Sequence, residues 1–231
     1  MKTRLLGCLL WVVSSPLWAG KLPVDPAAAA ALDDWLAYQV TIETWAAPVK
    51  QVRALKSLAR PLISTGSVTY ARPGRFRWQL GDPPRTLVIG TAAELLIAYP
   101  KLKQLERYEH GAQIDPTLRQ VIDLLVLGFP SSAATFRDRY VLVRSRLNDA
   151  EEPIRSFELQ PKNATSGRFL ALAVLDVRAF DQRLMATEFH FPDGSSMRNE
   201  FAEPVVNGLV EDARFQLNVP DGWLVSEPLV D

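Results

Sequence analysis

Hydrophobic and polar residues alternate along much of this chain, with the period of two that is typical of half-buried β-strands. Residues 75–80 (RFRWQL) are the clearest example, because an apolar side chain occupies every second position. Successive side chains of a strand point to opposite faces, so Phe76, Trp78 and Leu80 are expected to share one face. A short strand with one buried face is therefore the basic unit that the pattern predicts.

The same pattern, or a short apolar run, recurs in other segments. Val68 and Tyr70 share one face of a strand at residues 67–71, and Leu96 lies in an apolar strand at residues 95–99. We expect roughly ten strands in an antiparallel arrangement. The remaining predicted strands cover residues 40–44, 86–89, 140–147, 156–161, 169–174, 188–191, 196–201 and 215–219.

Helical spacing appears before the first strand. Residues 27–36 show it, and Asp25 with Pro26 is typical of an N-cap followed by the first helical residue. A second, short helix is expected later in the chain, capped by Ser131 and ending near Arg139.

A longer helical segment interrupts the strands in mid-chain. Residues 116–128 (PTLRQVIDLLVLG) end at a glycine, a common helix stop. The apolar residues at helical spacing are Leu118, Val121, Ile122 and Leu125. We predict a mainly β (α+β) fold, in which a strongly curved antiparallel sheet carries an N-terminal helix and this insertion covers one face or mouth.

The N-terminus has the organisation of a secretory signal peptide. Two basic residues precede an apolar stretch at residues 5–13, and the small residues Ala19 and Gly20 follow it. The stretch is too short to span a bilayer comfortably, although an uncleaved anchor is the alternative. We predict a signal peptide at residues 1–20, export to the periplasm, and a single domain at residues 21–231.

The composition gives little support for catalysis. The 231 residues include 26 basic and 26 acidic side chains, so no net charge favours nucleic acid. The only cysteine, Cys8, lies in the predicted signal peptide, where a lipid-attachment site is the alternative interpretation. The histidines, His110 and His190, are far apart. We expect no metal, no cofactor and no enzymatic activity, unless folding brings catalytic residues together.

A basic segment lies between the first two groups of strands. Lys50, Arg53 and Lys56 recur every third residue between apolar residues, and Arg60 follows. One interpretation is an amphipathic surface element that meets anionic headgroups or an acidic partner protein. The other is a solvated hairpin end.

Residues 66–104 contain an ordered series of motifs. In chain order these are Gly66, the turn Arg72-Pro73-Gly74, Phe76, Trp78, Pro84, Tyr99, Pro100 and Gln104. This series resembles the periplasmic outer-membrane lipoprotein carrier (LolA) family, and weaker similarity continues to about residue 225. The turn at residues 90–94, the shortened Tyr99-Pro100 motif and the long segment at residues 46–62 depart from the family pattern and suggest a divergent member.

The resemblance implies an unclosed β half-barrel whose interior holds acyl chains beneath a helical lid. It implies that Arg72 bonds to the lid and that the lid carries Leu118, Val121, Ile122 and Leu125. A surface turn residue is the alternative for Arg72, and ordinary packed core for Phe76 and Trp78. The expected lipid-cavity residues are Phe76, Trp78, Leu80, Val68, Tyr70 and Leu96.

The function that the resemblance implies is that of a periplasmic chaperone. Such a carrier binds the acyl chains of lipoproteins and shuttles them from an inner-membrane exporter complex to an outer-membrane acceptor. We expect a monomer that binds lipoprotein or another acylated lipid, and no nucleic acid. Two alternatives remain: a paralogous carrier of another lipid or glycolipid, and a lipid-sensing envelope regulator.

Overall fold

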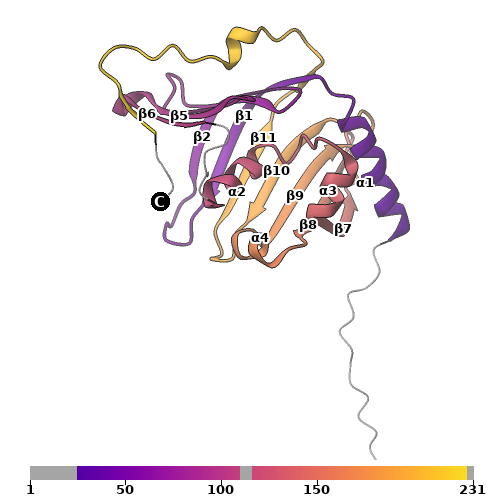
Figure 1. Cartoon of the computed structure of the whole chain (residues 1–231). Helices are drawn as coiled ribbons and strands as arrows, with labels where there is room; N and C mark the ends of the chain where they lie inside the picture. The colour runs from indigo at the N-terminus through magenta and orange to yellow at the C-terminus, as the bar shows by residue number, and fades with distance from the viewer. Residues whose placement is uncertain (1–24, 110–115, 228–231) are drawn as a thin grey trace, which may run out of the picture.

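The computed structural model describes residues 25–109 and 116–227. The expected signal peptide at residues 1–20, with Cys8, lies outside the described residues, as does His110. The fold is one large curved sheet with four α-helices on its concave side (Figure 1). Within the described ranges, no helix is both long enough and apolar enough to cross a membrane.

The strands run through almost the whole chain. They are β1 (Thr44–Ala54), β2 (Leu62–Ala71), β3 (Arg75–Leu80), β4 (Thr86–Gly90), β5 (Glu94–Tyr99), β6 (Gln104–Glu109), β7 (Tyr140–Leu147), β8 (Ile154–Pro161), β9 (Leu172–Arg178), β10 (Leu184–His190), β11 (Ser196–Phe201), β12 (Val205–Val206) and β13 (Leu224–Ser226). The helices are α1 (Pro26–Gln39), α2 (Pro116–Leu125), α3 (Ala133–Arg139), α4 (Ala164–Phe169) and the short 3-10 turns η1 (Pro100–Leu102) and η2 (Asp212–Phe215).

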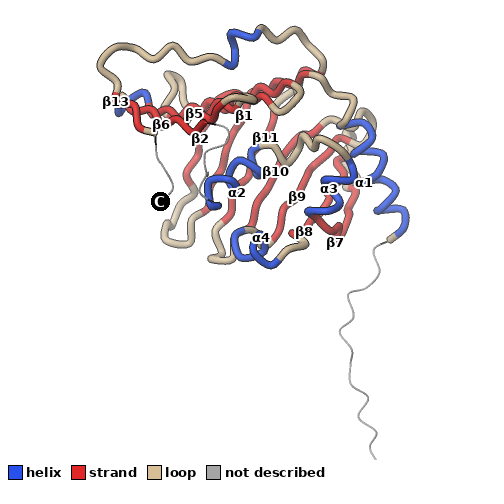
Figure 2. The backbone as a smooth tube through the Cα atoms, viewed as in Figure 1, coloured by secondary structure: helices blue, strands red, loops and turns tan. Residues whose placement is uncertain are grey.

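The strand order is β13-β6-β5-β4-β3-β2-β1-β11-β10-β9-β8-β7, and the short β12 pairs with β1. All neighbours are antiparallel except β13 and β6. In the described part of the chain β7 and β13 remain unpaired edges, so the sheet is not closed. The predicted unclosed half-barrel is confirmed. Figure 2 shows the two halves of the sheet, β1–β6 and β7–β11, meeting at an angle with the helices between them.

The helix caps follow the expected physical chemistry. The side chain of Asp25 accepts a hydrogen bond from the backbone N–H of Ala27, and Pro26 begins α1. The cap of α3 is Ser132, and the prediction of Ser131 is wrong by one residue. Ser132 accepts from the backbone N–H of Thr135, which places the start of α3 one residue later.

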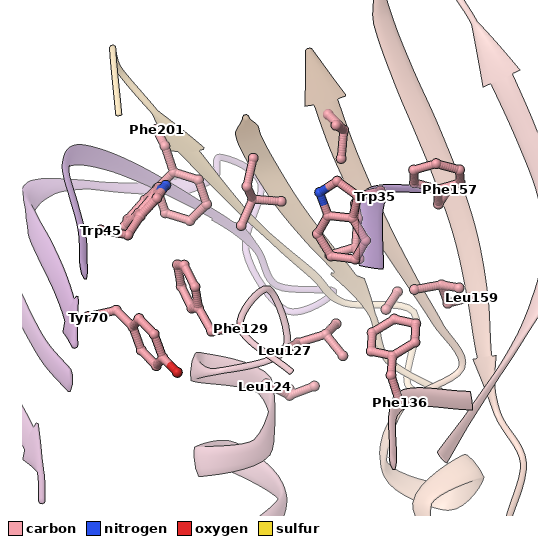
Figure 3. Close-up of a cluster of buried hydrophobic side chains, with 14 of the residues drawn as sticks. Trp35, Trp45, Tyr70, Leu124, Leu127, Phe129, Phe136, Phe157, Leu159 and Phe201 are labelled. Atoms are coloured by element: carbon pink, nitrogen blue, oxygen red, sulfur yellow. The ribbon is translucent and has the colours of Figure 1, made fainter. Parts of the chain in front are cut away.

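The concave face holds the main hydrophobic core. Side chains of α1, α2 and α3 meet side chains from both halves of the sheet there (Figure 3). Trp35 of α1 packs edge-on against Phe136 of α3, with ring centroids 6.1 Å apart. Trp45 of β1 packs in the same way on Phe201 of β11, at 5.0 Å. The first pair joins two helices to each other, and the second joins β1 to β11, where the two halves of the sheet meet.

A second core lies on the convex face of β2–β6. Residues 207–223, which we call the strap, cross this face as the yellow segment of Figure 1. Phe215 is buried in it, and the Arg75 guanidinium lies 4.8 Å from the centre of its ring. Arg75 also pairs with Asp212 at 2.6 Å, and Arg77 donates to the carbonyl of Arg214. The outward residues of β3 therefore hold the strap in place.

Three predicted strands differ from the structure. Residues 40–43 form a turn because α1 continues to Gln39. Residues 164–169 form α4, capped by Asn163, so the strand predicted at 169–174 begins only at Leu172. Residues 215–219 belong to the strap and are no strand, because their apolar side chains pack on the sheet without joining its ladder. The strands β6, β12 and β13 were not predicted, nor were residues 45–54 of β1 and residues 62–66 of β2.

The basic segment at residues 50–60 belongs to the β1–β2 hairpin. Lys50 and Arg53 lie on β1, and Lys56 and Arg60 lie in the turn. Lys50 pairs with Glu200 of β11 at 3.2 Å. The segment therefore ends a hairpin at the surface, a position that fits both interpretations.

Candidate functional site

An open cavity of about 440 Å³ lies between the concave face of β2–β5 and the segment from α2 to β7. Most of its wall is apolar: Tyr70, Phe76, Leu95, Ile122, Val126, Leu127, Phe129, Phe136 and Tyr140. Its volume falls in the range of about 300–1,000 Å³ that is usual for small-molecule sites. The cavity is therefore suited to a hydrophobic ligand.

The sheet wall of the cavity is one row of cross-strand neighbours. Trp45 pairs with Tyr70, Tyr70 with Phe76, Phe76 with Gly90, and Gly90 with Leu95. A Cβ atom on Gly90 would lie 2.2 Å from the ring of Phe76. Because Gly90 has no side chain, the ring of Phe76 can lie directly over it.

The helical wall inserts one aromatic ring into this row. Phe129 follows α2 and stacks on Tyr70, with ring centroids 4.3 Å apart and an interplanar angle of 11° (Figure 3). It also packs edge-on against Trp45 at 5.1 Å. The preceding Gly128 packs closely on Leu184, since an added Cβ would lie 2.3 Å from the Leu184 Cδ2 atom. Phe129 thus fills the concave face at the inner end of the cavity.

Arg72 lies at the rim and binds the end of α1. Its Nε donates to the carbonyl of Ile42 at 3.1 Å, and its Nη2 donates to the carbonyl of Gln39 at 3.2 Å. The residues that follow α1 are thus tied to the β2–β3 turn. Within the described ranges no hydrogen bond joins Arg72 to α2, so the predicted lid contact is replaced by a contact with the end of α1.

The rim carries more positive than negative charge. Arg119 and Arg139 lie there with Asp123, which pairs with Arg139 at 2.9 Å. Burial, supported by the nearby Asp123 carboxylate and opposed by Arg139, raises the pKa of Tyr140 to about 12. Burial likewise raises the pKa of Tyr70, against the lowering effect of Arg72. The tyrosines of the cavity are therefore neutral at physiological pH.

Tyr140→Phe tests this environment through the pH dependence of stability. A tyrosine ionises near pH 10 in the unfolded chain, whereas Tyr140 stays neutral to about pH 12 in the folded protein. The contribution of neutral Tyr140 to the free energy of unfolding is fully present below pH 10 and is lost as the pH rises from 10 through 12. From pH 9.5 to 12, we expect the free energy of unfolding of wild type to fall by about 2 kcal/mol more than that of Tyr140→Phe.

Chemical denaturation at each pH measures this difference. Tyr38→Phe is the comparison at a position away from the cavity, and it should depart from wild type in the same direction, because burial also raises the pKa of Tyr38. Parallel pH curves for wild type and Tyr140→Phe would contradict a desolvated Tyr140.

The expected cavity residues do not all lie on the cavity. Tyr70, Phe76 and Arg72 line it. Val68 and Trp78 lie one cross-strand row away on the same face, and Leu80 packs partly buried beside them. The expectation for Leu96 is wrong, because Leu96 faces the convex core beneath the strap, and its neighbour Leu95 faces the cavity.

Of the expected lid residues on α2, three pack inward and one is exposed. Leu118, Ile122 and Leu125 of α2 pack partly buried against the main core, and Ile122 lines the cavity. Val121 is 40% exposed and lies outside the core, so its expected inward position is wrong. Leu124 is buried in its place.

Most of the residues that line the cavity were not predicted from the sequence, Val126, Leu127 and Phe136 among them. Trp45, Leu95, Phe129 and Tyr140 belong to the row of aromatics or to the cavity wall. Leu95 was hidden because Leu95 and Leu96 are both apolar. Phe129 was hidden because it follows a predicted helix stop, where no periodicity applies. Tyr140, the first residue of a predicted strand, had no signal to mark its direction.

The described residues contain no group of three or more His, Cys, Asp or Glu side chains placed to hold a metal ion. His190 of β10 pairs with Glu188 of the same strand at 3.0 Å and is partly exposed, in line with its expected outward direction. The geometry therefore offers a hydrophobic cavity with a basic rim.

Comparison with known proteins supports this assignment. The family model described as outer membrane lipoprotein carrier protein LolA matches residues 40–218. An outer-membrane lipoprotein carrier protein of Chromohalobacter salexigens is 26% identical over 157 residues, which are 68% of each chain. Members of this family are binding proteins without enzymatic activity.

A solved structure shares the fold. An uncharacterized conserved protein from Thermus thermophilus has a TM-score of 0.52 and 14% identity, over 87% of this chain and 99% of that one. A LolA superfamily protein from Nitrosomonas europaea has a TM-score of 0.39 and 12% identity, over 80% and 97%. The family match covers well over half of the chain, and this protein is therefore a divergent member of the LolA family of outer-membrane lipoprotein carriers.

Proposed function

We propose that the protein is a periplasmic chaperone that holds the acyl chains of lipoproteins in this cavity and carries them from the inner to the outer membrane. The observation that carries the proposal is the cavity itself. It has a volume of about 440 Å³, lies between the sheet and a separate helical segment, and has a mostly apolar wall. Acyl chains have no polar groups, so an apolar wall meets their whole requirement.

The energetics favour burial of cargo. Each methylene group removed from water contributes about 0.8 kcal/mol, so acyl chains gain strongly from a dry cavity. The volume of the cavity suits a single small ligand, and a lipoprotein with several chains needs more room. We infer that loading moves α2 and the Phe129 segment away from β2.

Release of cargo requires that the empty state be favourable. The hydrogen bonds from Arg72 to Gln39 and Ile42 tie α1 to the cavity rim in the structure described here. We infer that loading also loosens these bonds at the end of α1, so that they stabilise the closed, empty carrier and thereby favour release. A ligand shifts such an equilibrium only by its difference in affinity for the two states.

Arg72→Leu is expected to slow release of a bound acyl probe about tenfold. It also removes two charge-assisted hydrogen bonds, which contribute about 1.5–3 kcal/mol each, and so lowers the stability of the empty protein. Stopped-flow transfer of the probe to acceptor vesicles measures the rate. Arg72→Lys keeps the charge but cannot form the same pair of bonds, so we expect an intermediate rate. Release at the wild-type rate from both variants would contradict the role of Arg72.

Cargo is identified by mass spectrometry of lipids and lipoproteins that copurify with the protein from the periplasm. We expect to recover triacylated lipoprotein. Transfer of that lipoprotein from inner-membrane vesicles to outer-membrane vesicles by the purified protein would then test the carrier role directly. Recovery of a single glycolipid or other lipid would instead favour a paralogous carrier. The absence of any acylated molecule, where an established lipoprotein carrier retains its cargo, would overturn the proposal.

A further inference from the structure

The end of the β1–β2 hairpin carries apolar side chains that are exposed to solvent. Leu58 lies in the turn and is 45% exposed, and Leu62 and Ile63 at the start of β2 are 46% and 58% exposed. The hairpin end is the purple loop at the lower left of Figure 1. Clustered exposed apolar side chains often mark a surface that meets a partner or a membrane.

The same hairpin end is strongly basic. Arg53, Lys56 and Arg60 lie on it, and no acidic residue occurs from Thr44 to Gly81. In the described part of the chain none of these three cations forms an ion pair within 4.0 Å, whereas Lys50 is paired with Glu200.

The nearest acidic turn is occupied by bonds of its own. Asp193, in the β10–β11 turn beside Lys56, accepts hydrogen bonds from the backbone N–H and the hydroxyl of Ser195. Lys56 contributes only the last of several effects that lower the pKa of Asp193. The positive charge of the hairpin end is therefore available to an external anion.

We propose that this hairpin end docks on an anionic phospholipid surface. Leu62 and Ile63 are consecutive strand residues, so they point to opposite faces of the hairpin. A rigid protein partner contacts mainly one face of a hairpin, whereas a fluid lipid interface surrounds an inserted tip on both. Basic residues beside the apolar tip then meet the lipid phosphates, as in amphipathic membrane-binding segments.

The docking surface is separate from the acyl cavity. None of its residues lines that cavity, which opens near the β2–β3 turn at the other end of β2. Docking would bring the carrier to the membrane surface where cargo is handed over, without requiring that cargo be bound. Vesicle binding and acyl binding can therefore be measured independently on the same protein.

Sedimentation with vesicles tests the proposal. We expect the protein to bind phosphatidylglycerol vesicles and to bind phosphatidylcholine vesicles much more weakly. A basic residue near an anionic surface contributes about fivefold to the binding constant, so Lys56→Glu with Arg60→Glu should weaken binding by about 30-fold or more. High salt should weaken the wild type as well, since it screens these charges.

Two further variants separate the contributions. Leu58→Ser with Ile63→Ser should weaken binding while leaving the basic residues intact. Lys162→Glu with Arg168→Glu makes the same charge change at exposed residues around α4. Vesicle binding by this variant should stay within about twofold of wild type, because salt strongly screens charges beyond about 10 Å. All substituted side chains are exposed, so the thermal midpoints should stay close to that of wild type.

Equal binding to the two lipids would overturn the proposal, as would equal effects of the hairpin and α4 charge reversals. Failure of the wild type to bind phosphatidylglycerol vesicles would overturn it as well, and would leave an acidic protein as the occupant. Normal acyl binding by the hairpin variants is expected, because their positions lie outside the cavity.

Discussion

Replacing Phe129 by alanine should destabilise the protein and at the same time strengthen its binding of acyl chains. The ring is 8% exposed, stacks on Tyr70 and packs edge-on against Trp45. Loss of a buried phenylalanine side chain costs about 3–5 kcal/mol of the free energy of unfolding. The space that the ring leaves adjoins the cavity and is available to a ligand.

The expected gain in affinity follows from the same space. If the vacated volume buries about two further methylene groups, at about 0.8 kcal/mol each, affinity for a fluorescent fatty-acyl probe rises about tenfold. Chemical denaturation measures the first effect and titration with the probe measures the second. An effect on stability without any gain in affinity would show that acyl chains do not enter beside Phe129.

Phe215→Ala provides the matched control. Phe215 is also buried, at 4% exposure, and packs under the strap on the convex face of the same sheet. Its loss should destabilise the protein by a similar amount, because a similar ring and the contact with Arg75 are removed. Probe affinity should stay unchanged. A gain of affinity in both variants would indicate a general loosening of the fold.

The strap also explains which parts of the fold could be predicted from the sequence. Where one face of a strand meets the core and the other meets polar contacts, as in β3, alternation places Phe76 and Trp78 correctly. In β5 both Leu95 and Leu96 are buried, because the strap covers the convex face. Two apolar faces erase the alternation, so the sequence does not tell which leucine faces the cavity.

The site was less predictable than the sheet for a related reason. Residues 215–219 alternate as a strand does, yet their apolar face packs on the sheet without joining its ladder, and periodicity cannot distinguish these cases. Phe129 contacts Tyr70 and Trp45, which are distant in sequence. Helical spacing located α2, but packing against the sheet decides that Leu124 is buried and Val121 exposed.

Adjacent residues of α2 offer the sharpest test of the cavity. Ile122 lines it, whereas its neighbour Val121 is 40% exposed and lies outside the core. Ile122→Glu should weaken binding of the acyl probe by about 100-fold, because an ionised carboxylate beside an acyl chain loses its water without gaining a partner. In the empty protein the open cavity leaves this carboxylate hydrated, so the loss of stability should stay near 1 kcal/mol.

Val121→Glu introduces the same charge one residue away and should bind the probe with nearly wild-type affinity. Ile122→Gln has almost the same shape as the glutamate but no charge, so its affinity should fall between those of wild type and Ile122→Glu. Binding by Ile122→Glu should also recover partly near pH 4, where a carboxyl group is largely protonated. Equal losses in Val121→Glu and Ile122→Glu would mean that α2 does not meet the ligand through its cavity face. The two variants carry the same charge, so a difference in probe affinity between them reports the position of Ile122 on the cavity side of α2.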